Sequence, residues 1–369
     1  MTTPLRPSGA SIWTMCAASA RMSARMPQEP PSDPAREGTC AAWLAEIVLN
    51  KQVARCADAI GMIHENGWIV TDDMAHLVQG YVDLMFSRGT EVFTERKVVL
   101  NDQIAGTPDA FAVVDKTGTL HVDDLKFGYR IVEPHKNTQV SIYAGALLRK
   151  LTAHGVIIRD VQVGIYQPRA WHPAGIYRTW RVYPDVLMQH VHWIEERGRE
   201  AAKPNATAVP GTHCRYCPAT ATCAVSARAL YDFFEDACES TQRHMTDDEI
   251  ATELTFLEKV ESIFEGRKTA LTAEAEGRLQ RGRGIPGWHL EERRGNARFK
   301  VSEMIIRSLT GIDPTERKLI SPAELIRKGA DEAIVRKLVD RPVLKPTLKP
   351  IPPGFYTNLF ERQKNGNQS

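Results

Sequence analysis

Two aspartates and a lysine stand out because their types and spacing suit chemistry on phosphates. Asp109 closes the string GTPD, and Asp124 and Lys126 lie in the string VDDLKFG. Residues two apart in a strand face the same side of a sheet, so Asp124 and Lys126 should project together. Carboxylate oxygens are the ligands that Mg²⁺ or Mn²⁺ prefers, and such an ion lowers the pKa of a bound water. We therefore predict a hard-cation site with an ammonium group beside it.

Two polar residues on a neighbouring helix extend this candidate site. Gln139 and Tyr143 are four residues apart in HKNTQVSIYAGALLRKL, whose spacing predicts a helix, so they should share one face. Taken singly, each of these residues could be an ordinary turn or surface residue. Their order and spacing together favour a site.

A cysteine triplet forms the second constellation. Cys214, Cys217 and Cys223 are thiols at metal-ligand spacing, and a triplet needs a fourth ligand from elsewhere, for which Cys16 is the candidate. Zinc remains an alternative metal, although structural zinc usually uses paired cysteines. The other cysteines are most simply small buried hydrophobes, although each is also an alternative fourth ligand: Cys40, Cys56 and Cys238.

The elements that must position these residues follow from periodicity and turn residues. Helical spacing is expected over 33–50 (with Asp33 as N-cap), 71–86, 135–151, 184–201 and 247–279. Short β-rich runs are expected over 91–100, 109–115, 119–127, 161–168 and 175–183. This order of helices and strands predicts an α/β core with a central mixed sheet flanked by helices, followed by a mostly helical C-terminal appendage.

Composition and charge are those of an ordinary globular chain of 369 residues, with 43% hydrophobic and 25% charged residues. No apolar run approaches the roughly 18 residues of a membrane span, and the N-terminus shows no secretory signal, so we expect a cytoplasmic protein without a membrane partner. Residues 281–369 carry a balance of +8, and the rest is near −6. The basic residues and aromatics of 281–300 could contact phosphates and bases, or could be a small hairpin with solvated charges.

The strings GTPD, VDDLKFG and NTQVSIYAG resemble motifs II, III and IV of the RecB-like PD-(D/E)XK nucleases. The resemblance implies a PD-(D/E)XK (restriction-endonuclease-like) core that acts on DNA with Mg²⁺ or Mn²⁺. It implies metal ligands at Asp109, Asp124 and the Leu125 carbonyl, a catalytic lysine at Lys126, and supporting residues near the DNA at Gln139 and Tyr143.

The cysteine arrangement resembles that of AddB-type and CRISPR-associated iron–sulfur nucleases, in which one cysteine precedes the nuclease motifs and three follow them. The resemblance implies a [4Fe–4S] cluster held by Cys16, Cys214, Cys217 and Cys223. Residues 1–236 would then be the nuclease domain that the cluster closes. Residues 237–369 would be a basic, mostly helical C-terminal region.

The strings SGASIWTMC and EGTCAAWLAE resemble the opening of phage-encoded RecB-like nucleases, but Ala42 stands where that family has a metal-site histidine. Glu37 or Glu46 could substitute for it, or both could be surface helix residues. The resemblance implies a metal-dependent deoxyribonuclease, an exonuclease in phage DNA recombination or processing, with a single-strand annealing protein as a partner. The alternative, which Ala42 favours, is a non-catalytic DNA-binding or scaffold protein with the nuclease fold.

Overall fold

The structure, a computed structural model, describes residues 5–26, 31–88, 91–114, 117–238 and 245–290, without the side chains of 114 and 233–238. Residues 1–283 group into one compact unit and residues 284–369 into a second. Helix α7 (Ala224–Cys238) runs across the boundary expected at residue 236. That domain boundary stays a prediction.

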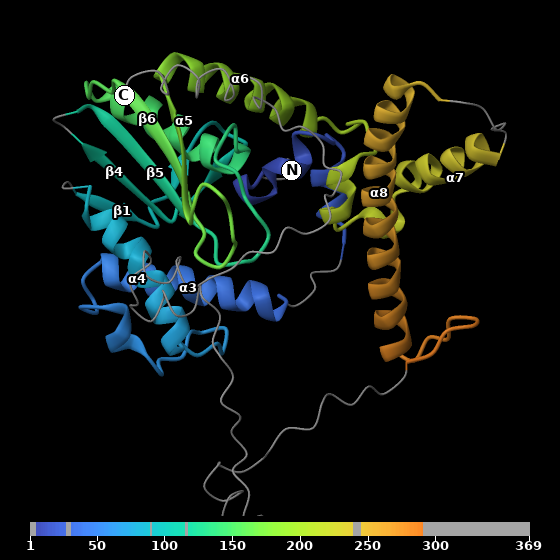
Figure 1. The fold of residues 1–369 in the computed structure, drawn as a ribbon, viewed down its shortest axis with the longest axis horizontal. Coiled ribbons are helices and arrows are strands. Elements are labelled where there is room, and N and C mark those ends of the chain that lie inside the picture. The colour runs from blue at the N-terminus through green and yellow to red at the C-terminus, as the bar shows by residue number, and fades with distance from the viewer. Residues whose placement is uncertain (1–4, 27–30, 89–90, 115–116, 239–244, 291–369) are drawn as a thin grey trace, which may run out of the picture. The chain divides into compact units, whose positions relative to one another are not determined.

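A five-stranded mixed sheet lies at the centre of the first unit, in the order β1-β4-β5-β6-β7 (Figure 1). Its strands are β1 (Val92–Thr94), β4 (Ala110–Val114), β5 (Thr119–Leu125), β6 (Asp160–Tyr166) and β7 (Tyr177–Val182). Only β5 and β6 pair in parallel, and the other three pairs are antiparallel. A parallel pair needs a crossover, which α5 (Thr138–Ala153) supplies. The predicted central mixed sheet is confirmed.

Helices cover both faces of this sheet. On one face α5 packs against β5 and β6, with α6 (Pro184–Ala201) beside it. On the other, α3 (Asp33–Leu49) and α4 (Asp72–Phe86) pack together, α3 against β1 and α4 against β4. The caps are local: the Thr71 hydroxyl accepts from the Met74 amide at the start of α4, and the Asn137 side chain accepts from the Val140 amide at the start of α5.

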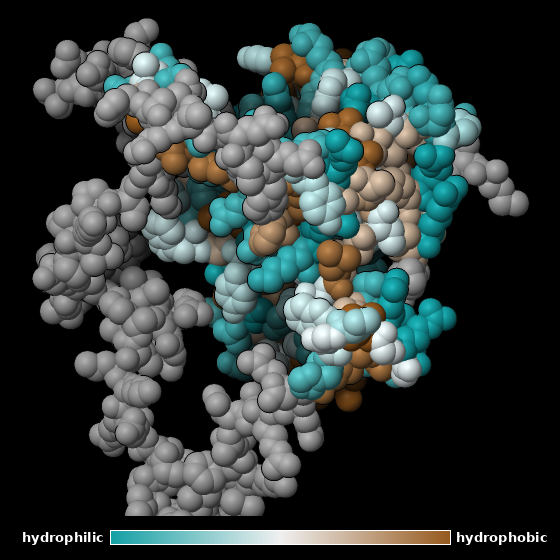
Figure 2. Space-filling model, turned by 90° about the vertical axis from the view of Figure 1, so that its right-hand side faces the viewer, coloured by the Kyte–Doolittle hydropathy of each residue, from teal (hydrophilic) through white to brown (hydrophobic). Residues whose placement is uncertain are grey.

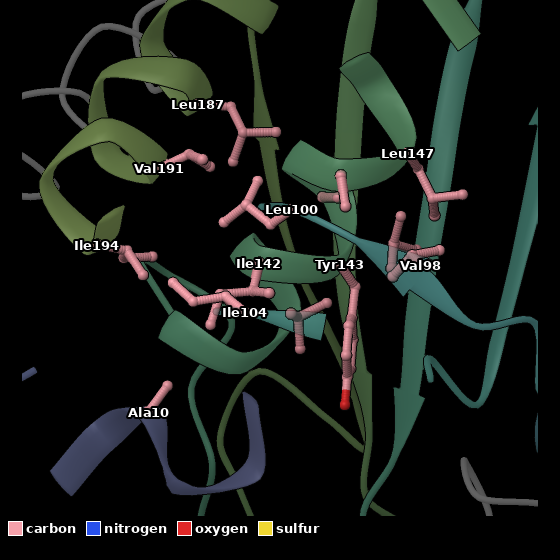
Figure 3. Close-up of a cluster of buried hydrophobic side chains, with 14 of the residues drawn as sticks. Ala10, Val98, Leu100, Ile104, Ile142, Tyr143, Leu147, Leu187, Val191 and Ile194 are labelled. Carbon is pink, nitrogen blue, oxygen red and sulfur yellow. The ribbon is translucent and has the colours of Figure 1, made fainter. Parts of the chain in front are cut away.

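Alternation along β5 divides the core in two. Leu120 and Val122 belong to the cluster under α5 and α6, whereas Leu125 belongs to the cluster under α3 and α4. Figure 3 shows the first cluster, where Ile142 of α5 and Val191 of α6 meet in a layer of aliphatic side chains. By the same alternation, Asp124 and Lys126 lie on the α5 side of the sheet.

Two local expectations were wrong. The run 91–100 is not one strand: β1 ends at Thr94, and β2 (Val98–Val99) pairs instead with β3 (Ala105–Gly106). Glu95 between them has φ +45°, a left-handed conformation that a strand cannot continue through. The N-cap of α3 is Ser32 rather than Asp33, which is the first helical residue.

The remaining helices lie before and after these elements in the chain. Three short ones near the N-terminus are η1 (Pro7–Gly9), α1 (Ala10–Trp13) and α2 (Ser19–Ser23), and η2 (Cys56–Ala59) follows α3. After α6 come η3 (Thr212–Tyr216), η4 (Thr220–Thr222), α7 and the long α8 (Asp247–Gln280), which contacts η3 and η4.

On the face shown in Figure 2, hydrophobic side chains form separate groups among hydrophilic ones. Within the described residues, no helix is long and apolar enough to cross a membrane.

Candidate active site and cysteine cluster

The end of β5 brings the predicted acidic and basic residues together. Lys126 Nζ lies 2.8 Å from Asp124 Oδ2, in an ion pair whose carboxylate side chain is 2% exposed. Asp109, which immediately precedes β4, accepts a 2.9 Å hydrogen bond at Oδ2 from the Leu125 amide. The antiparallel register between β4 and β5 places Ala110 opposite Asp123. The carboxylates of Asp109 and Asp124, the residues next to this pair, therefore lie at the same end of the sheet.

Gln139 joins this group to α5. Its Oε1 accepts from Lys126 Nζ at 3.1 Å, and its Nε2 donates to Asp124 Oδ1 at 3.3 Å. The same Nε2 donates to the Tyr143 hydroxyl at 3.4 Å, one helical turn away. The fold therefore brings together all five side chains that the sequence singled out.

Burial and the closeness of two carboxylates determine the electrostatics of the group. Burial, reinforced by the Asp124 carboxylate, raises the pKa of Asp109 well above its ordinary range. Burial disfavours the Lys126 ammonium, but Asp124 and Asp109 outweigh it and raise the pKa of that lysine. Burial also raises the pKa of Tyr143 to about 12. Lys126 is therefore a cation at neutral pH, and Tyr143 is a neutral hydroxyl.

The buried Asp124 Oδ2 faces the Lys126 ammonium at 2.8 Å and makes no further hydrogen bond. Buried carboxylate oxygens are normally hydrogen-bonded or bound to a cation. Within the described part of the chain, no three His, Cys, Asp or Glu side chains gather as ligands of one ion. A cation here would therefore depend on two aspartates plus main-chain or solvent oxygens, a donor set that suits Mg²⁺ or Mn²⁺.

The two glutamates considered as substitutes for a histidine at position 42 differ in their surroundings. Glu37 accepts two hydrogen bonds from Arg169, at 2.7 and 2.8 Å, so its carboxylate is already paired. Burial, and then the charge of Glu46, raise the pKa of Glu95. The charge of Glu95 is in turn one of the causes that raise the pKa of Asp109. Sequence reasoning missed Glu95, because the run around it reads as an unbroken strand.

The four predicted cluster cysteines line one small cavity, although Cys16 is nearly 200 residues before the triplet. Three of their sulfurs receive main-chain amides: Val209 N lies 3.5 Å from Cys16 Sγ, Gly211 N 3.4 Å from Cys214 Sγ, and Ser226 N 3.4 Å from Cys223 Sγ. The fourth, Cys217 Sγ, lies 3.9 Å from the Ser23 hydroxyl. Amide donors aimed at sulfur stabilise thiolates and are a usual surrounding of iron–sulfur ligands.

The charges of these thiols also affect one another. Burial, then the neighbouring Cys16 and Cys214, raise the pKa of Cys217, so a bound cation would favour its thiolate. In a four-iron cluster each cysteine binds a different iron, and its sulfurs stand farther apart than the ligands of a single ion. Among the residues that the structure describes, no three of these side chains gather closely enough to bind one metal ion, so the cysteines suit such a cluster better than a single zinc ion.

The remaining described cysteines lie away from this cavity. Cys40 and Cys56 are fully buried in the cluster under α3 and α4, as expected of small hydrophobes. Burial raises the pKa of Cys40 to about 11 and that of Cys56 to about 12, so both stay thiols. The side chain of Cys238 and the basic residues beyond 290 lie outside the described residues.

Helix α8 covers the cysteine triplet at very short range. A Cβ added at Gly266 would lie 2.4 Å from the Cα of Arg215, between Cys214 and Cys217. Arg267 Nη1 donates to the carbonyl of Thr220 at 3.0 Å. A glycine at this crossing allows the helix backbone to touch the triplet backbone.

Comparisons with known proteins identify a family. No curated protein matches the sequence. A crystal structure from Eubacterium rectale, provisionally described as an exonuclease, is similar over 54% of this chain and 81% of its own, with 8% identity and a TM-score of 0.34. A likeness this distant leaves the chemistry to be argued from the site itself. The model of the family described as "protein of unknown function (DUF2800)" matches residues 3–353. The chain belongs to the DUF2800 family.

Proposed function

We propose that this protein is a metal-dependent deoxyribonuclease with a PD-(D/E)XK core of the RecB-like type, acting as an exonuclease in phage DNA recombination or processing. The observation that carries the proposal is the convergence of Asp109, Asp124, Lys126 and Gln139 at the end of β5, where two buried carboxylates stand beside an ammonium group. On the same resemblance, a single-strand annealing protein is its proposed partner.

Each residue has a role that its surroundings support. Asp109 and Asp124 would hold Mg²⁺ or Mn²⁺ together with the Leu125 carbonyl, and the bound ion would lower the pKa of a water and neutralise phosphate charge. The Lys126 ammonium lies 2.8 Å from Asp124 Oδ2, so it would stand beside the bound ion and stabilise the negative charge that develops on the phosphate.

Gln139 and Tyr143 would position rather than react. Gln139 contacts both Lys126 and Asp124, so it fixes their separation, and Tyr143 holds the Gln139 amide.

We further propose a structural [4Fe–4S] cluster on Cys16, Cys214, Cys217 and Cys223. The shared cavity and the main-chain amide donors to three of the four sulfurs support it. Hydrolysis needs no redox step, so the cluster's contribution would be to hold the ends of the unit together.

The proposed activity is tested with end-labelled linear DNA, single- and double-stranded, incubated with Mn²⁺, with Mg²⁺ or with a chelator. The protein should cut only with metal, and both Asp124→Asn and Lys126→Ala should lose cleavage while keeping their folded spectra. Asp102→Asn and Lys97→Ala, at exposed positions, are the matched controls and should cut normally. Equal cleavage by Asp124→Asn would exclude this site. DNA binding without any cleavage would instead support the scaffold alternative.

A further inference from the structure

A groove of about 910 Å³ opens beside the proposed active site, and Lys126 and Gln139 form part of its lining. The rest of the lining comes from the N-terminal helices, from residues 130–138 after β5, and from α6. Its volume is within the range of sites that bind organic ligands. Whatever lies in the groove therefore lies next to the reacting group of the proposed nuclease.

The charge of the groove suits a polyanion. Arg130 and Lys136 are exposed in its lining, in addition to the site lysine. The acidic side chain among the lining residues, Glu133, lies 3.8 Å from the Nε of Arg178, whose positive charge offsets its own, and 3.1 Å from the Nε2 of His172. The guanidinium of Arg130 stacks 3.9 Å above the ring of Tyr216, which fixes that cation in place.

An aromatic surface lies in the same groove. Trp193 is 39% exposed, and its ring stacks on His190 with centroids 5.5 Å apart and planes 12° apart. His190 Nε2 donates to the Lys136 carbonyl at 3.1 Å, which orients the imidazole. Burial lowers the pKa of His190, so the ring is uncharged at neutral pH and suited to stacking. The apolar side chains of Met15 and Ile131 are exposed nearby in the lining, at 52% and 45%.

Cations combined with a flat aromatic surface are the features by which proteins hold unpaired nucleic acid, because phosphates pair with the cations while base faces stack on the rings. In a duplex those faces are already stacked inside the helix. We propose that the groove binds an unpaired DNA strand, with a base stacked on Trp193 and phosphates near Arg130 and Lys136. The proposal rests on the proposed function only for what happens at Lys126.

The test is a binding measurement without metal, in chelator, so that no cleavage interferes. Fluorescence anisotropy would compare a labelled oligothymidylate strand, an abasic strand of the same length and charge, and the oligothymidylate annealed to its complement. Wild-type protein should bind the thymidylate strand about tenfold more tightly than the abasic strand, the size of one stacking contact. Trp193→Ala should remove that difference and leave abasic binding unchanged.

Two further variants separate stacking from charge and from general surface effects. Trp171→Ala is the matched control, since Trp171 is 78% exposed but does not line the groove, and its binding should equal the wild type. Lys136→Ala should weaken the thymidylate and abasic strands equally and reduce the salt dependence of both, because one phosphate contact is lost.

The proposal is wrong if Trp193→Ala binds oligothymidylate like the wild type, or if the wild type binds the abasic strand or the duplex as tightly. A base preference without metal-dependent cleavage would uphold the groove and overturn the nuclease proposal alone. Cleavage that depends on Asp124 without any base preference would do the reverse.

Discussion

Gln139 has three side-chain partners, since its amide contacts Lys126, Asp124 and the Tyr143 hydroxyl. Gln139→Ala should therefore lower Mn²⁺-dependent cleavage by about 10- to 100-fold, as expected when a partner of a metal ligand is removed. The change leaves both carboxylates present but lets the Lys126 ammonium move. Single-turnover rates over a Mn²⁺ titration would separate lost metal affinity from a lost rate at saturation.

Tyr143→Phe is the graded comparison for that variant. It removes one 3.4 Å hydrogen bond and keeps the ring in the core cluster. Its rate should lie between those of the wild type and Gln139→Ala. A larger defect in Tyr143→Phe than in Gln139→Ala would show that the tyrosine acts by another route.

His121 on β5 gives a pH dependence that can be assigned to one residue. Burial first, then the positive charge of Arg88, lower the pKa of His121 to about 4, and its Nδ1 has no hydrogen-bond partner. Because the unfolded chain takes up the proton near the ordinary value of about 6.5, the stabilising contribution is complete above that pH. It is lost progressively as the pH falls from about 6.5 to about 4.

The melting temperature should therefore fall less between pH 7 and pH 5 in His121→Leu than in the wild type. His154→Leu, at the exposed C-cap of α5, should keep the wild-type difference. Parallel melting curves for His121→Leu and wild type would show that His121 is not protonated on unfolding.

Which residues could be foreseen depends on how far apart they are in the chain. Asp124 and Lys126 share a face because of the two-residue period of a strand, and Gln139 and Tyr143 because of the helical turn, so local geometry was enough. The pairing of Glu37 with Arg169 joins residues 132 positions apart, which no local period encodes. Glu95 was missed because its left-handed φ breaks an otherwise strand-like run.

Helix α8 makes a close contact between its backbone and that of η3. At Gly266 an added Cβ would lie 2.4 Å from the Arg215 Cα and 2.9 Å from its amide nitrogen, and backbone cannot rotate away as a side chain can. Gly266→Ala should therefore lower the free energy of unfolding by about 1–3 kcal/mol, the usual cost of overpacking. Chemical denaturation would measure it.

Gly277→Ala on the same helix is the matched control. Its added Cβ would approach no closer than 3.4 Å, to the flexible side chain of Arg281. Alanine is the better helix former by about 1 kcal/mol, so this variant should be as stable as the wild type or more stable. Equal losses in both variants would mean that α8 does not depend on close contact at Gly266.

At the scale of elements, the sequence predicted the long helices α3, α4, α5, α6 and α8 and the strands β4 to β7, because their periodic runs are long and their caps local. It did not predict the short helices α1 and α2, or α7. It did not predict that α8 covers the cysteine triplet. That contact depends on a single glycine in a long helical run, and a lone glycine in a helix has many explanations.

At the scale of the whole molecule, the cysteine cavity joins the two ends of the folded unit. Cys16→Ala and Cys217→Ala should each lose iron and lower the melting temperature of anaerobically purified protein, which should otherwise hold about four irons per chain. A bridge across roughly 200 residues restricts the unfolded chain, so its loss destabilises the fold beyond the removal of one thiol.

Cys40→Ala is the comparison, because Cys40 is equally buried but lies under α3 and α4. It should keep its iron, with only the modest loss of stability of a small cavity. Stoichiometric zinc in wild-type protein, or a full cluster in Cys16→Ala, would contradict the assignment.

The contacts of the N-terminal segment also set an order of events during synthesis. The Thr14 carbonyl accepts from Arg197 Nε at 2.7 Å, and the Ala18 amide donates to the Thr207 carbonyl at 3.3 Å, so the partners of this segment are made more than 180 residues later. At about 5–20 residues per second, translation leaves the segment without them for roughly ten seconds or longer. All strands of the central sheet have been made once Val182 is added, but the groove beside Lys126 is also lined by residues 186–193 of α6, which follow it. A nascent chain that ends before α6 would therefore carry Asp124 and Lys126 without the α6 side of the groove.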